Sequence, residues 1–314
     1  MSTNDRIAAC GTCAATVIYM ILGITAIISI FSPFLTKLAS HGKTRVLLLE
    51  ARDQDDDHAN ISSSSMVFMV WKFLDHPLLQ IPKMRFASFY SIGLVCSAYM
   101  LWDSCEKWAS TLLCIHLARR YVECRCVHKW HGTMHLAGYA LGLLHYFLLP
   151  FMFKSHYYIR LSWPGCIVGV SLNVYAQYNQ YLHHFILGNY RSLSHREKGQ
   201  RYFIPFGHWF DYVSCPHYLA EILIYASFAI LLHPSVHDDD NDADGVGVGV
   251  VVVVCDANRW SAEICSLILP WRHVVLLLWV AINLAVSARS SHGWYQNQFK
   301  AYPKNRCALI PFLW

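Results

Sequence analysis

Residues 215–232 read CPHYLAEILIYASFAILL, an apolar run that contains one imidazole and one carboxylate. His217 and Glu221 are four residues apart, a spacing that places both on one face of a helix. A charged carboxylate in apolar surroundings is costly and needs a partner. Because Glu221 has no basic residue within its own helix, we expect the partner to come from elsewhere, and Arg289 and Arg306 are available. A purely structural ion pair is the alternative.

A second apolar run, residues 165–187, carries four polar side chains at intervals of four, three and four residues. At 3.6 residues per turn this spacing places all four on one helical face. Four polar groups in a stripe that leads towards Arg191 favour a polar cavity. The alternative is hydrogen bonding between helices, which polar residues of membrane helices often supply. The four residues are Asn173, Gln177, Gln180 and His184.

The C-terminal segment SARSSHGWYQNQFKAYPKNRCALIPFLW, residues 287–314, combines arginine, histidine, tryptophan and tyrosine beside an apolar run. Arginines bind phosphate and aromatic rings stack on planar groups, so the segment suits a pocket for a phosphate-bearing aromatic cofactor. An aromatic belt at a membrane surface is the alternative. The sequence has no GxGxxG after a strand and no Walker loop, so a nucleotide would be held between helices by side chains.

Histidines and cysteines are numerous, with 18 and 12 residues. His128, His131 and His135 have the spacing H-x2-H-x3-H, but the several HxxHH-type boxes of membrane di-iron oxygenases do not occur in the sequence. Two cysteine pairs are closely spaced, Cys10 with Cys13 and Cys124 with Cys126, but neither has a second pair at zinc-finger spacing. Other cysteines lie in or beside apolar runs, where cysteine packs as a small hydrophobe. We therefore expect no metal site and no disulfide framework.

The composition of the chain indicates a membrane protein. Of its 314 residues, 55% are hydrophobic and only 14% are charged, with a mean hydropathy of +0.30, whereas about a quarter of the residues of soluble domains are charged. Seven apolar segments are candidate membrane spans, and the one that runs into Arg119 is the weakest. We expect an all-α polytopic membrane protein with about seven transmembrane helices. The segments are 14–35, 86–102, 109–118, 134–153, 165–187, 216–233 and 267–288.

The distribution of lysine and arginine predicts the orientation in the membrane. With seven spans and the N-terminus outside the cytosol, the cytosolic segments hold 19 of the 25 basic residues. This asymmetry places the C-terminus in the cytosol, because basic residues gather in cytoplasmic loops. The cytosolic segments would be 36–85, 119–133, 188–215 and 289–314.

Several stretches match a known family. Residues 202–229 (YFIPFGHWFDYVSCPHYLAEILIYASFA) and 292–314 (HGWYQNQFKAYPKNRCALIPFLW) resemble the C-terminal domain of the steroid 5-alpha-reductase family, and within it the polyprenol reductase branch. The resemblance covers most of residues 35–314 and fails over two inserts. The inserts are the polar loop 51–65 and the low-complexity stretch 237–255, which we expect to be a non-cytosolic loop. Shorter matches are HGKTR (41–45), IPKMRFASFY (81–90), HLARRYVEC (116–124) and QYLHHFILGNYR (180–191).

The resemblance implies a seven-helix membrane fold that holds NADPH in a cytosol-facing cavity among the C-terminal helices. Residues 1–130 would then form the lipid-substrate side, and residues 131–314 the NADPH-binding part, within one integrated fold. Carried over by position, the implied catalytic residues are Glu221, His217 and His292, and the implied cofactor-binding residues are Gln180, His184, Arg191, Arg289, Tyr302 and Arg306.

The sequence also departs from the steroid-reducing members of this family. Those members have Asn at the positions of Gln180 and His217, Asp at the position of His184, and an arginine at the position of Phe203. The glutamate and tyrosine thought to polarise the steroid ketone are replaced here by apolar residues. Their absence argues against a steroid substrate and for a prenyl chain. The two apolar residues are Ile81 and Leu117.

The resemblance therefore implies an endoplasmic-reticulum membrane reductase that acts from the cytosolic side. NADPH would reduce the double bond of the isoprene unit nearest the oxygen of a long polyprenoid, with polyprenal as the species reduced, and the product would feed dolichol for N-glycosylation. We expect no nucleic acid, metal or obligate protein partner. Two enzyme alternatives are a 3-oxo-steroid 5-alpha-reductase and a prenylcysteine methyltransferase that uses S-adenosylmethionine, because CPHYLAE resembles its HPxYxGE pattern. A lipid-binding scaffold or channel is the non-enzyme alternative.

Overall fold

The computed structural model describes residues 3–31, 76–102, 107–130, 132–153, 163–196, 202–232 and 271–311. Both predicted inserts and the sequon at Asn60 lie outside the described residues, as do parts of the predicted cytosolic segments. Within the described ranges, most residues are helical, as the sequence predicts.

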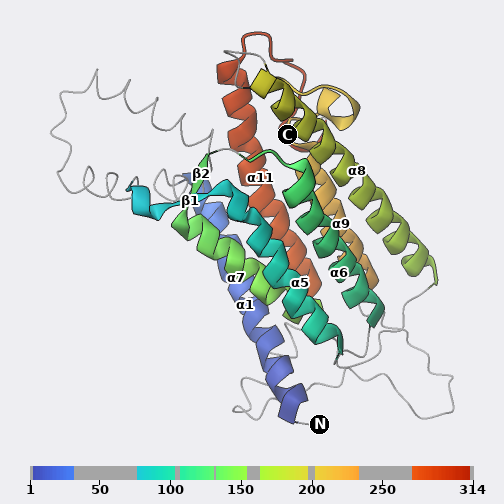
Figure 1. The fold of residues 1–314 in the computed structure, drawn as a ribbon. Helices are drawn as coiled ribbons and strands as arrows, with labels where there is room; N and C mark the ends of the chain where they lie inside the picture. The colour runs from blue at the N-terminus through green and yellow to red at the C-terminus, as the bar shows by residue number, and fades with distance from the viewer. Residues whose placement is uncertain are drawn as a thin grey trace.

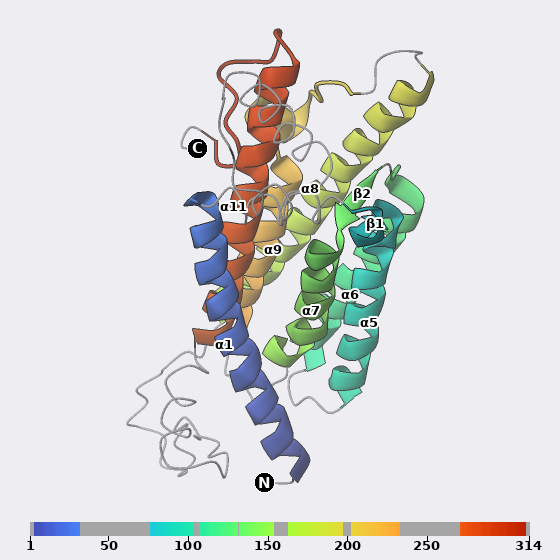
Figure 2. The ribbon, with the colours of Figure 1, turned by 90° about the vertical axis from the view of Figure 1, so that its left-hand side faces the viewer.

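Within the described residues, seven α-helices form one bundle, and successive helices run in opposite directions along it (Figures 1 and 2). The start of α1 and the segment after the last helix lie at opposite ends of the bundle (Figure 1). The helices are α1 (Thr3–Phe31), α5 (Phe86–Trp102), α6 (Lys107–Val122), α7 (Leu136–Phe153), α8 (Trp163–Arg196), α9 (Pro216–Leu232) and α11 (Arg272–Gln298).

Each of the seven predicted segments overlaps one of these helices, but they differ in how well they suit a membrane. Three are long and apolar enough to span one, namely Lys83–Trp102, Leu136–Phe153 and Arg272–Gln298. Gly11–Ala26 and Pro216–Leu232 are apolar but shorter. Helices α6 and α8 are less apolar because they carry the basic pair and the polar stripe. The chain is a multi-pass helical membrane protein.

Short elements connect the helices and join distant parts of the chain. Strands β1 (Gln80–Pro82) and β2 (Thr133–His135) pair antiparallel, with Ile81 opposite Met134. This pairing fixes the start of α5 beside the start of α7. The other short elements are the 3-10 helices η1 (Pro77–Leu79), η2 (Lys83–Arg85) and η4 (His208–Asp211), and the π-helical turn η3 (Glu123–Val127).

Helix contacts form a closed ring around the core. Helix α8 packs against α9, α9 against α11, and α11 against α1; α1 packs against α7, α7 against α5, and α5 against α6. The π-helical turn η3 at the end of α6 closes the ring against α8. One apolar cluster, with members on all seven helices, fills the interior. The polar groups of the site lie among these apolar side chains.

Three helices extend beyond the predicted span ends. Helix α6 continues beyond the predicted span end at residue 118 to Val122 and then forms η3. Helix α8 likewise continues to Arg196 and α11 to Gln298. The additional turns carry Arg119, Arg120, Arg191 and His292.

The segment after α11 folds back against the segment before α9. Val213 and Cys307 form an isolated parallel bridge, and the backbone N–H of Ser214 donates to the carbonyl oxygen of Cys307 at 2.9 Å. An aromatic cluster of Trp294, Tyr295 and Tyr302 packs beside this bridge, against Tyr202 and Ile204 among others. The end of the chain therefore covers the start of α9, where His217 lies.

Candidate functional site

Glu221 lies on α9 and finds its partners on two other helices. Its carboxylate accepts a hydrogen bond from Nε2 of Gln180 on α8. On the other side, Nε2 of His116 on α6 lies 3.5 Å from the carboxylate. The expectation that Arg289 or Arg306 pairs with Glu221 is wrong, because Arg289 is exposed on α11 and Arg306 contacts the chain around Pro205.

The end of α6 supplies the charges that balance this carboxylate. Arg119 and Arg120 both donate to Glu123, which follows them by four and three residues and is buried. Residues at these spacings are neighbours on a helix surface. Sequence reasoning missed this arrangement, because Arg119 was predicted only as the end of a membrane span. The Arg-Arg-x-x-Glu spacing next to an apolar run was the available signal.

Arg119 links Glu123 to the polar stripe of α8. Its Nε donates to Oε1 of Gln177 at 3.1 Å, and its Nη2 contacts Oε1 of Gln180. Its Nη2 also lies 3.3 Å from Nδ1 of His116. Because an arginine can only donate, Nδ1 of His116 is the acceptor and the imidazole hydrogen lies on Nε2, facing Glu221. Arg119 therefore orients both neighbours of Glu221.

Arg120 contacts side chains of two other helices. Its Nη1 lies 2.8 Å from Nδ1 of His184, and its Nη2 donates to the hydroxyl oxygen of Tyr90 on α5 at 2.8 Å. The guanidinium also lies over the Tyr90 ring, 4.9 Å from its centroid. Arg120 is buried, so these contacts replace water around the charge.

The polar stripe of α8 faces inwards, as its spacing predicts. Asn173, Gln180 and His184 are buried and Gln177 is partly buried. Asn173 donates to Oγ of Ser227 on α9 at 2.8 Å, and Gln177 donates to Asn173 at 2.7 Å. All four side chains thus have a polar partner on another helix, and none lines the cleft described below. Hydrogen bonding between helices, the alternative to a cavity, accounts for this stripe.

The π-helical turn η3 brings α6 and α8 together. A Cβ atom at Gly188 of α8 would lie 2.6 Å from the carbonyl oxygen of Val127, so only glycine permits this approach. π-Helical turns inside helices occur frequently at functional sites. Here the turn directs Glu123 towards His184, whose Nδ1 lies 2.7 Å from the carboxylate.

Three imidazoles connect this buried cluster with the cleft. The ring of His184 lies 4.7 Å from that of His128 and 5.5 Å from that of His217, between centroids. Nδ1 of His217 is buried and has no hydrogen-bond partner in the described structure. Burial, together with the guanidinium groups of Arg120 and Arg191, lowers the pKa of His128 to about 3. His128 is therefore neutral at physiological pH.

Ligand atoms of Glu123, His128 and His184 lie within 4.8 Å of one another, a spacing that a metal ion can bridge. Both guanidinium groups of the basic pair already bind the carboxylate of Glu123. A divalent cation at this position would have to displace Arg119 or Arg120 and lie beside the positive charge of the other. The donor set therefore suits an internal ion-pair network better than a metal.

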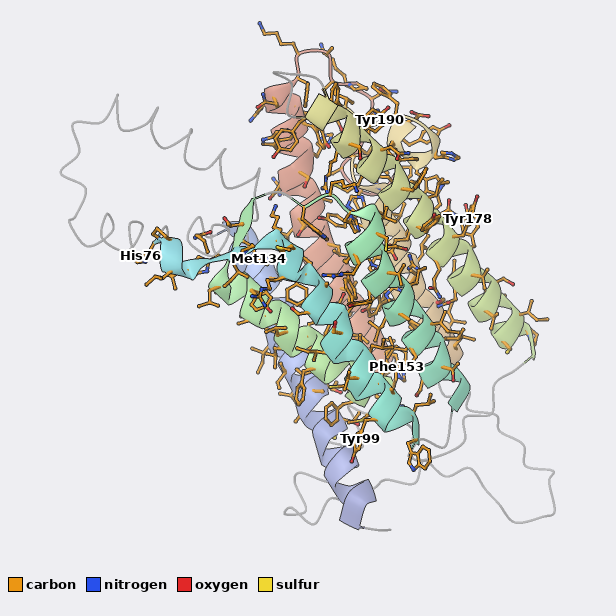
Figure 3. All side chains as sticks on the ribbon, in the orientation of Figure 1. His76, Tyr99, Met134, Phe153, Tyr178 and Tyr190 are labelled. Atoms are coloured by element: carbon orange, nitrogen blue, oxygen red, sulfur yellow. The ribbon has the colours of Figure 1, made fainter. Side chains whose placement is uncertain are left out.

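A cleft opens where α8 ends and α9 begins. It is open to solvent, and the space between its lining residues is about 680 Å³ when the open part is included. Tyr190 lies near this end of α8, whereas Tyr178 lies lower on its outer face (Figure 3). The lining residues are Leu187, Tyr190, Arg191, Tyr202, Phe203, Pro205, Ser214, Cys215, His217, Tyr218, Ser291 and Tyr295.

Ser214 connects the cleft to two of the residues implied by the resemblance, His292 and Tyr302. Its Oγ lies 2.6 Å from Nδ1 of His292 and 2.6 Å from the Tyr302 hydroxyl, and it donates to the carbonyl oxygen of Cys307 at 3.1 Å. Because the only hydrogen of Ser214 goes to Cys307, His292 and Tyr302 are the donors. Nε2 of His292 then accepts from Gln296 at 2.8 Å. Ser214 was not found by sequence reasoning because a lone serine carries no pattern.

Arg306 lies directly behind the cleft. Its Nη1 donates to the carbonyl oxygen of the lining residue Pro205 at 3.1 Å, and its guanidinium lies 5.1 Å from the centroid of the Tyr302 ring. Its Nε is buried without a hydrogen-bond partner in the described structure. Burial also raises the pKa of the Tyr302 hydroxyl, so this tyrosine stays protonated and able to donate.

Of the nine site residues implied by the resemblance, eight lie in two connected regions and one lies in neither. His217 and Arg191 line the cleft, with His292, Tyr302 and Arg306 packed around it. Gln180, His184 and Glu221 belong to the buried charge cluster. Arg289 is exposed and lines neither region.

The sequence was compared with known protein families and with curated proteins. The family model described as 3-oxo-5-alpha-steroid 4-dehydrogenase matches residues 133–237 and 259–314, together about half of the chain. Similar curated proteins bear the name polyprenal reductase. The protein from Xenopus tropicalis is 30% identical over 219 residues, which cover 65% of this chain and 60% of the relative.

Two mammalian relatives align over more of the chain. The Homo sapiens protein is 27% identical over 289 residues, covering 74% of this chain and 78% of the relative. The Ailuropoda melanoleuca protein is 27% identical over 292 residues, covering 75% and 79%. The matched part includes the cleft-lining end of α8, all of α9 and the tail after α11. The chain therefore belongs to the 3-oxo-5-alpha-steroid 4-dehydrogenase family, which is the steroid 5-alpha-reductase family indicated by its motifs.

Proposed function

We propose that this protein reduces the double bond nearest the oxygen of a long polyprenoid aldehyde, using NADPH. The observation that carries this proposal is the connection between the cleft and the buried charge cluster. His217 lines the cleft, and its ring lies 5.5 Å from that of His184, which contacts Glu123 and Arg120. The names of the curated relatives support the substrate class and the CH–CH reduction.

The residues of the cleft fit a phosphate-bearing aromatic cofactor. Arg191 supplies a cation, several tyrosines and Phe203 supply aromatic faces, and Ser291 supplies a hydroxyl. Arg306 adds a second guanidinium with a buried, unpartnered Nε. In this assignment, Arg191 and Arg306 bind phosphate groups, while His217 and Glu221 hold the end of the cofactor that carries the nicotinamide. When bound, NADPH supplies the hydride.

The chain's own residues position and protect this reaction. Ser214, His292 and Tyr302 are hydrogen-bonded to one another, so they hold the segment after α11 against the start of α9. Gln180 and His116 fix the Glu221 carboxylate from opposite sides. The apolar cluster around these groups excludes water, which strengthens every electrostatic interaction inside it.

The aldehyde is the expected oxidation state of the substrate. When hydride adds to the β-carbon of an unsaturated aldehyde, the negative charge moves to oxygen, where a donor can stabilise it. An allylic alcohol offers no such position for the charge. We therefore assign polyprenal as the species reduced, with dolichal as the product and dolichol for N-glycosylation as the end of the pathway.

We further propose that the protein resides in the endoplasmic-reticulum membrane with the cleft facing the cytosol. The basic residues support this orientation, because 19 of 25 fall on the side assigned to the cytosol. The start of α1 and the segment after α11 lie at opposite ends of the bundle (Figure 1). This arrangement agrees with an orientation in which the two ends are on opposite sides of the membrane.

The test uses detergent-purified full-length protein. Incubation with NADPH and polyprenal is expected to yield dolichal, whereas polyprenol is expected to remain unchanged. A 3-oxo steroid with a conjugated double bond serves as the competing substrate. Rapid reduction of polyprenol without any dehydrogenase would disprove the aldehyde assignment, and preferential reduction of the steroid would disprove the substrate class.

A second measurement tests the cofactor. NADPH is expected to raise the thermal unfolding midpoint of the purified protein, and S-adenosylmethionine is expected to leave it unchanged. The reverse result would favour the methyltransferase alternative, which the family match does not support. No shift with either ligand and no turnover would favour the scaffold alternative.

A further inference from the structure

The proposed reaction requires a hydrogen-bond donor for the substrate, and this inference rests on that proposal. As hydride adds to the β-carbon, the π electrons shift towards the carbonyl and oxygen becomes an enolate. A donor aimed at this oxygen contributes a large part of such catalysis, because it stabilises charge that develops only during the reaction. The donor must lie inside the apolar bundle, because the prenyl chain carries the aldehyde into it.

Buried hydroxyl groups gather at one level of the bundle, where several helices meet. Tyr146 on α7 contacts Tyr90 on α5 and its neighbour His145, and the Tyr225 hydroxyl on α9 faces His145. Tyr225 lies one helical turn after Glu221, and Tyr90 and Tyr225 both interact electrostatically with Glu221. Gln180 and His116 contact this carboxylate directly, so the tyrosine hydroxyls are the candidate donors for a substrate at this level.

The partners of these tyrosines distinguish one from the others. The Tyr225 hydroxyl faces Nε2 of His145 at 3.4 Å, and the Tyr19 hydroxyl donates to the carbonyl oxygen of His145 at 3.0 Å. Tyr90 instead accepts a hydrogen bond from the Arg120 guanidinium at 2.8 Å. A hydroxyl oxygen that accepts from a cation is a stronger donor through its own hydrogen, because hydrogen bonds in a chain polarise one another.

Tyr146 completes the arrangement. Its ring lies edge-on to that of Tyr90, with centroids 4.9 Å apart, and this contact helps to fix the orientation of the Tyr90 ring. The Tyr90 hydroxyl oxygen accepts from Arg120, and that contact does not use the hydroxyl hydrogen of Tyr90. We therefore expect Tyr90 to donate this hydrogen to a substrate oxygen.

A small polar group can reach this level of the bundle. The Glu221 side chain keeps 14% of its surface exposed, and His145 and Tyr146 are also only partly buried. An aldehyde is the smallest carbonyl group and has no bulk beyond its oxygen and hydrogen. Its prenyl chain can continue among the apolar side chains of the core.

We infer that Tyr90, held by Arg120, donates the hydrogen bond that binds and polarises the carbonyl oxygen of an α,β-unsaturated aldehyde. In the balanced step, hydride forms a C–H bond at the β-carbon and the C=C π pair moves to give the enolate. Tyr90 stabilises the enolate oxygen. A proton then adds to the α-carbon and the carbonyl reforms, so one NADPH and one proton are consumed for each double bond reduced.

The decisive readout is the carbonyl stretching band of geranial labelled with ¹³C at the carbonyl, bound to the full-length protein with NADP⁺. Geranial is the unsaturated end of a polyprenal, and NADP⁺ cannot reduce it. In the wild type the band is expected at lower frequency than in an apolar solvent, because a strong donor weakens the C=O bond. In Tyr90→Phe, which retains the ring, the band should return towards its position in apolar solvent.

Tyr19→Phe is the matched control, because it also removes a buried hydroxyl from the cluster around His145 but leaves Arg120 untouched. Its band should remain at the wild-type position. With polyprenal and NADPH, Tyr90→Phe is expected to lower kcat by about 100-fold or more, the loss typical of one oxyanion donor. The thermal shift caused by NADPH should persist in both variants.

A wild-type band position in Tyr90→Phe would overturn the inference. If that variant does not accumulate in membranes, 3-fluorotyrosine at position 90 keeps the shape and makes a stronger donor, so the band should move further down; an unmoved band would refute the assignment. Failure of the wild type to reduce polyprenal, with a Tyr90-dependent band, would disprove the proposed reaction and leave carbonyl binding at Tyr90 intact.

Discussion

Nδ1 of His184 lies 2.7 Å from the carboxylate of Glu123, which joins the end of α6 to the middle of α8. The same carboxylate binds Arg119 and Arg120, and Arg120 also donates to Nδ1 of His184. His184 follows Glu123 by 61 residues in the sequence, whereas the two arginines are its close neighbours. Glu123 is therefore the centre of the buried network, although its own position next to a weak apolar run gives little sign of this role.

Glu123→Gln is expected to destabilise the protein strongly. The substitution leaves the buried Arg120 and the partly buried Arg119 without their carboxylate, and removing one partner of a buried ion pair costs about 3–5 kcal/mol. The thermal unfolding midpoint in detergent measures the loss. Arg125→Gln changes an exposed charge in the same turn and should have little effect. Equal midpoints for Glu123→Gln and the wild type would show that the network contributes no net stability.

Glu221→Gln is expected to lower polyprenal reduction by at least about 100-fold, because loss of a buried charged partner costs about 2–5 kcal/mol. The protein should still accumulate in membranes, since the amide can retain a hydrogen bond to Gln180. Asp211→Asn removes an exposed carboxylate near the cleft and serves as the control. Near wild-type turnover in a well-expressed Glu221→Gln protein would reduce this residue to a structural role.

Gly188→Ala is expected to weaken both stability and activity. The new methyl group would lie 2.6 Å from the backbone carbonyl oxygen of Val127, so η3 and α8 must separate and His184 must move from Glu123. Gly23→Ala on α1 is the matched control, because its Cβ meets nothing within 4 Å and alanine is the better helix former. A Gly188→Ala protein as stable and active as Gly23→Ala would show that this close approach is dispensable.

The low pKa of His128 predicts a specific pH dependence. The pKa is about 3 in the folded protein and roughly 6.5 in the unfolded chain. Between these values only the unfolded state binds the proton, so this group lowers the free energy of unfolding as pH falls, by up to about 1.4 kcal/mol per pH unit. In His128→Gln the decline of the unfolding midpoint between about pH 7 and pH 4.5 should be shallower. Parallel declines in both proteins would contradict the assignment.

The sequon at Asn60 tests the orientation, although it lies outside the described residues. Our charge count places residues 36–85 in the cytosol, where the glycosylation machinery does not reach. We expect Asn60 to be unmodified in cells. A mass shift on glycosidase treatment that disappears in Asn60→Gln would reverse the orientation, and with it access of the cleft to cytosolic NADPH.

The sequence predicted the helices and the inward-facing residues well, because both follow from periodicity. The spacing of Asn173, Gln177, Gln180 and His184 fixes their common face whatever lies opposite. It does not reveal the opposite partner, and so the stripe was interpreted as a cavity lining. The partners Arg119 and Ser227 belong to helices far away in the sequence.

The sequence also does not reveal which way side chains face near the end of α11. Arg289 lies beside the buried Ala288 and two residues before the cleft-lining Ser291, yet it faces outwards. One residue changes direction by about 100° around a helix, so a resemblance by position alone cannot settle which way an arginine points. Ser214, in contrast, was not predicted and yet lies in the site. Its hydrogen bonds depend on how the segment after α11 folds back.

The buried network also determines how this chain can be recombined with its relatives. Glu221 lies within the part that the family model matches, whereas Arg119, Arg120 and Glu123 precede its first matched residue at position 133. A chimera that joins residues 131–314 to the N-terminal helices of a family member without the basic pair would bury the Glu221 carboxylate without that counter-charge. A functional chimera must therefore keep both parts, because the two arginines before position 133 balance the charges of Glu123 and Glu221.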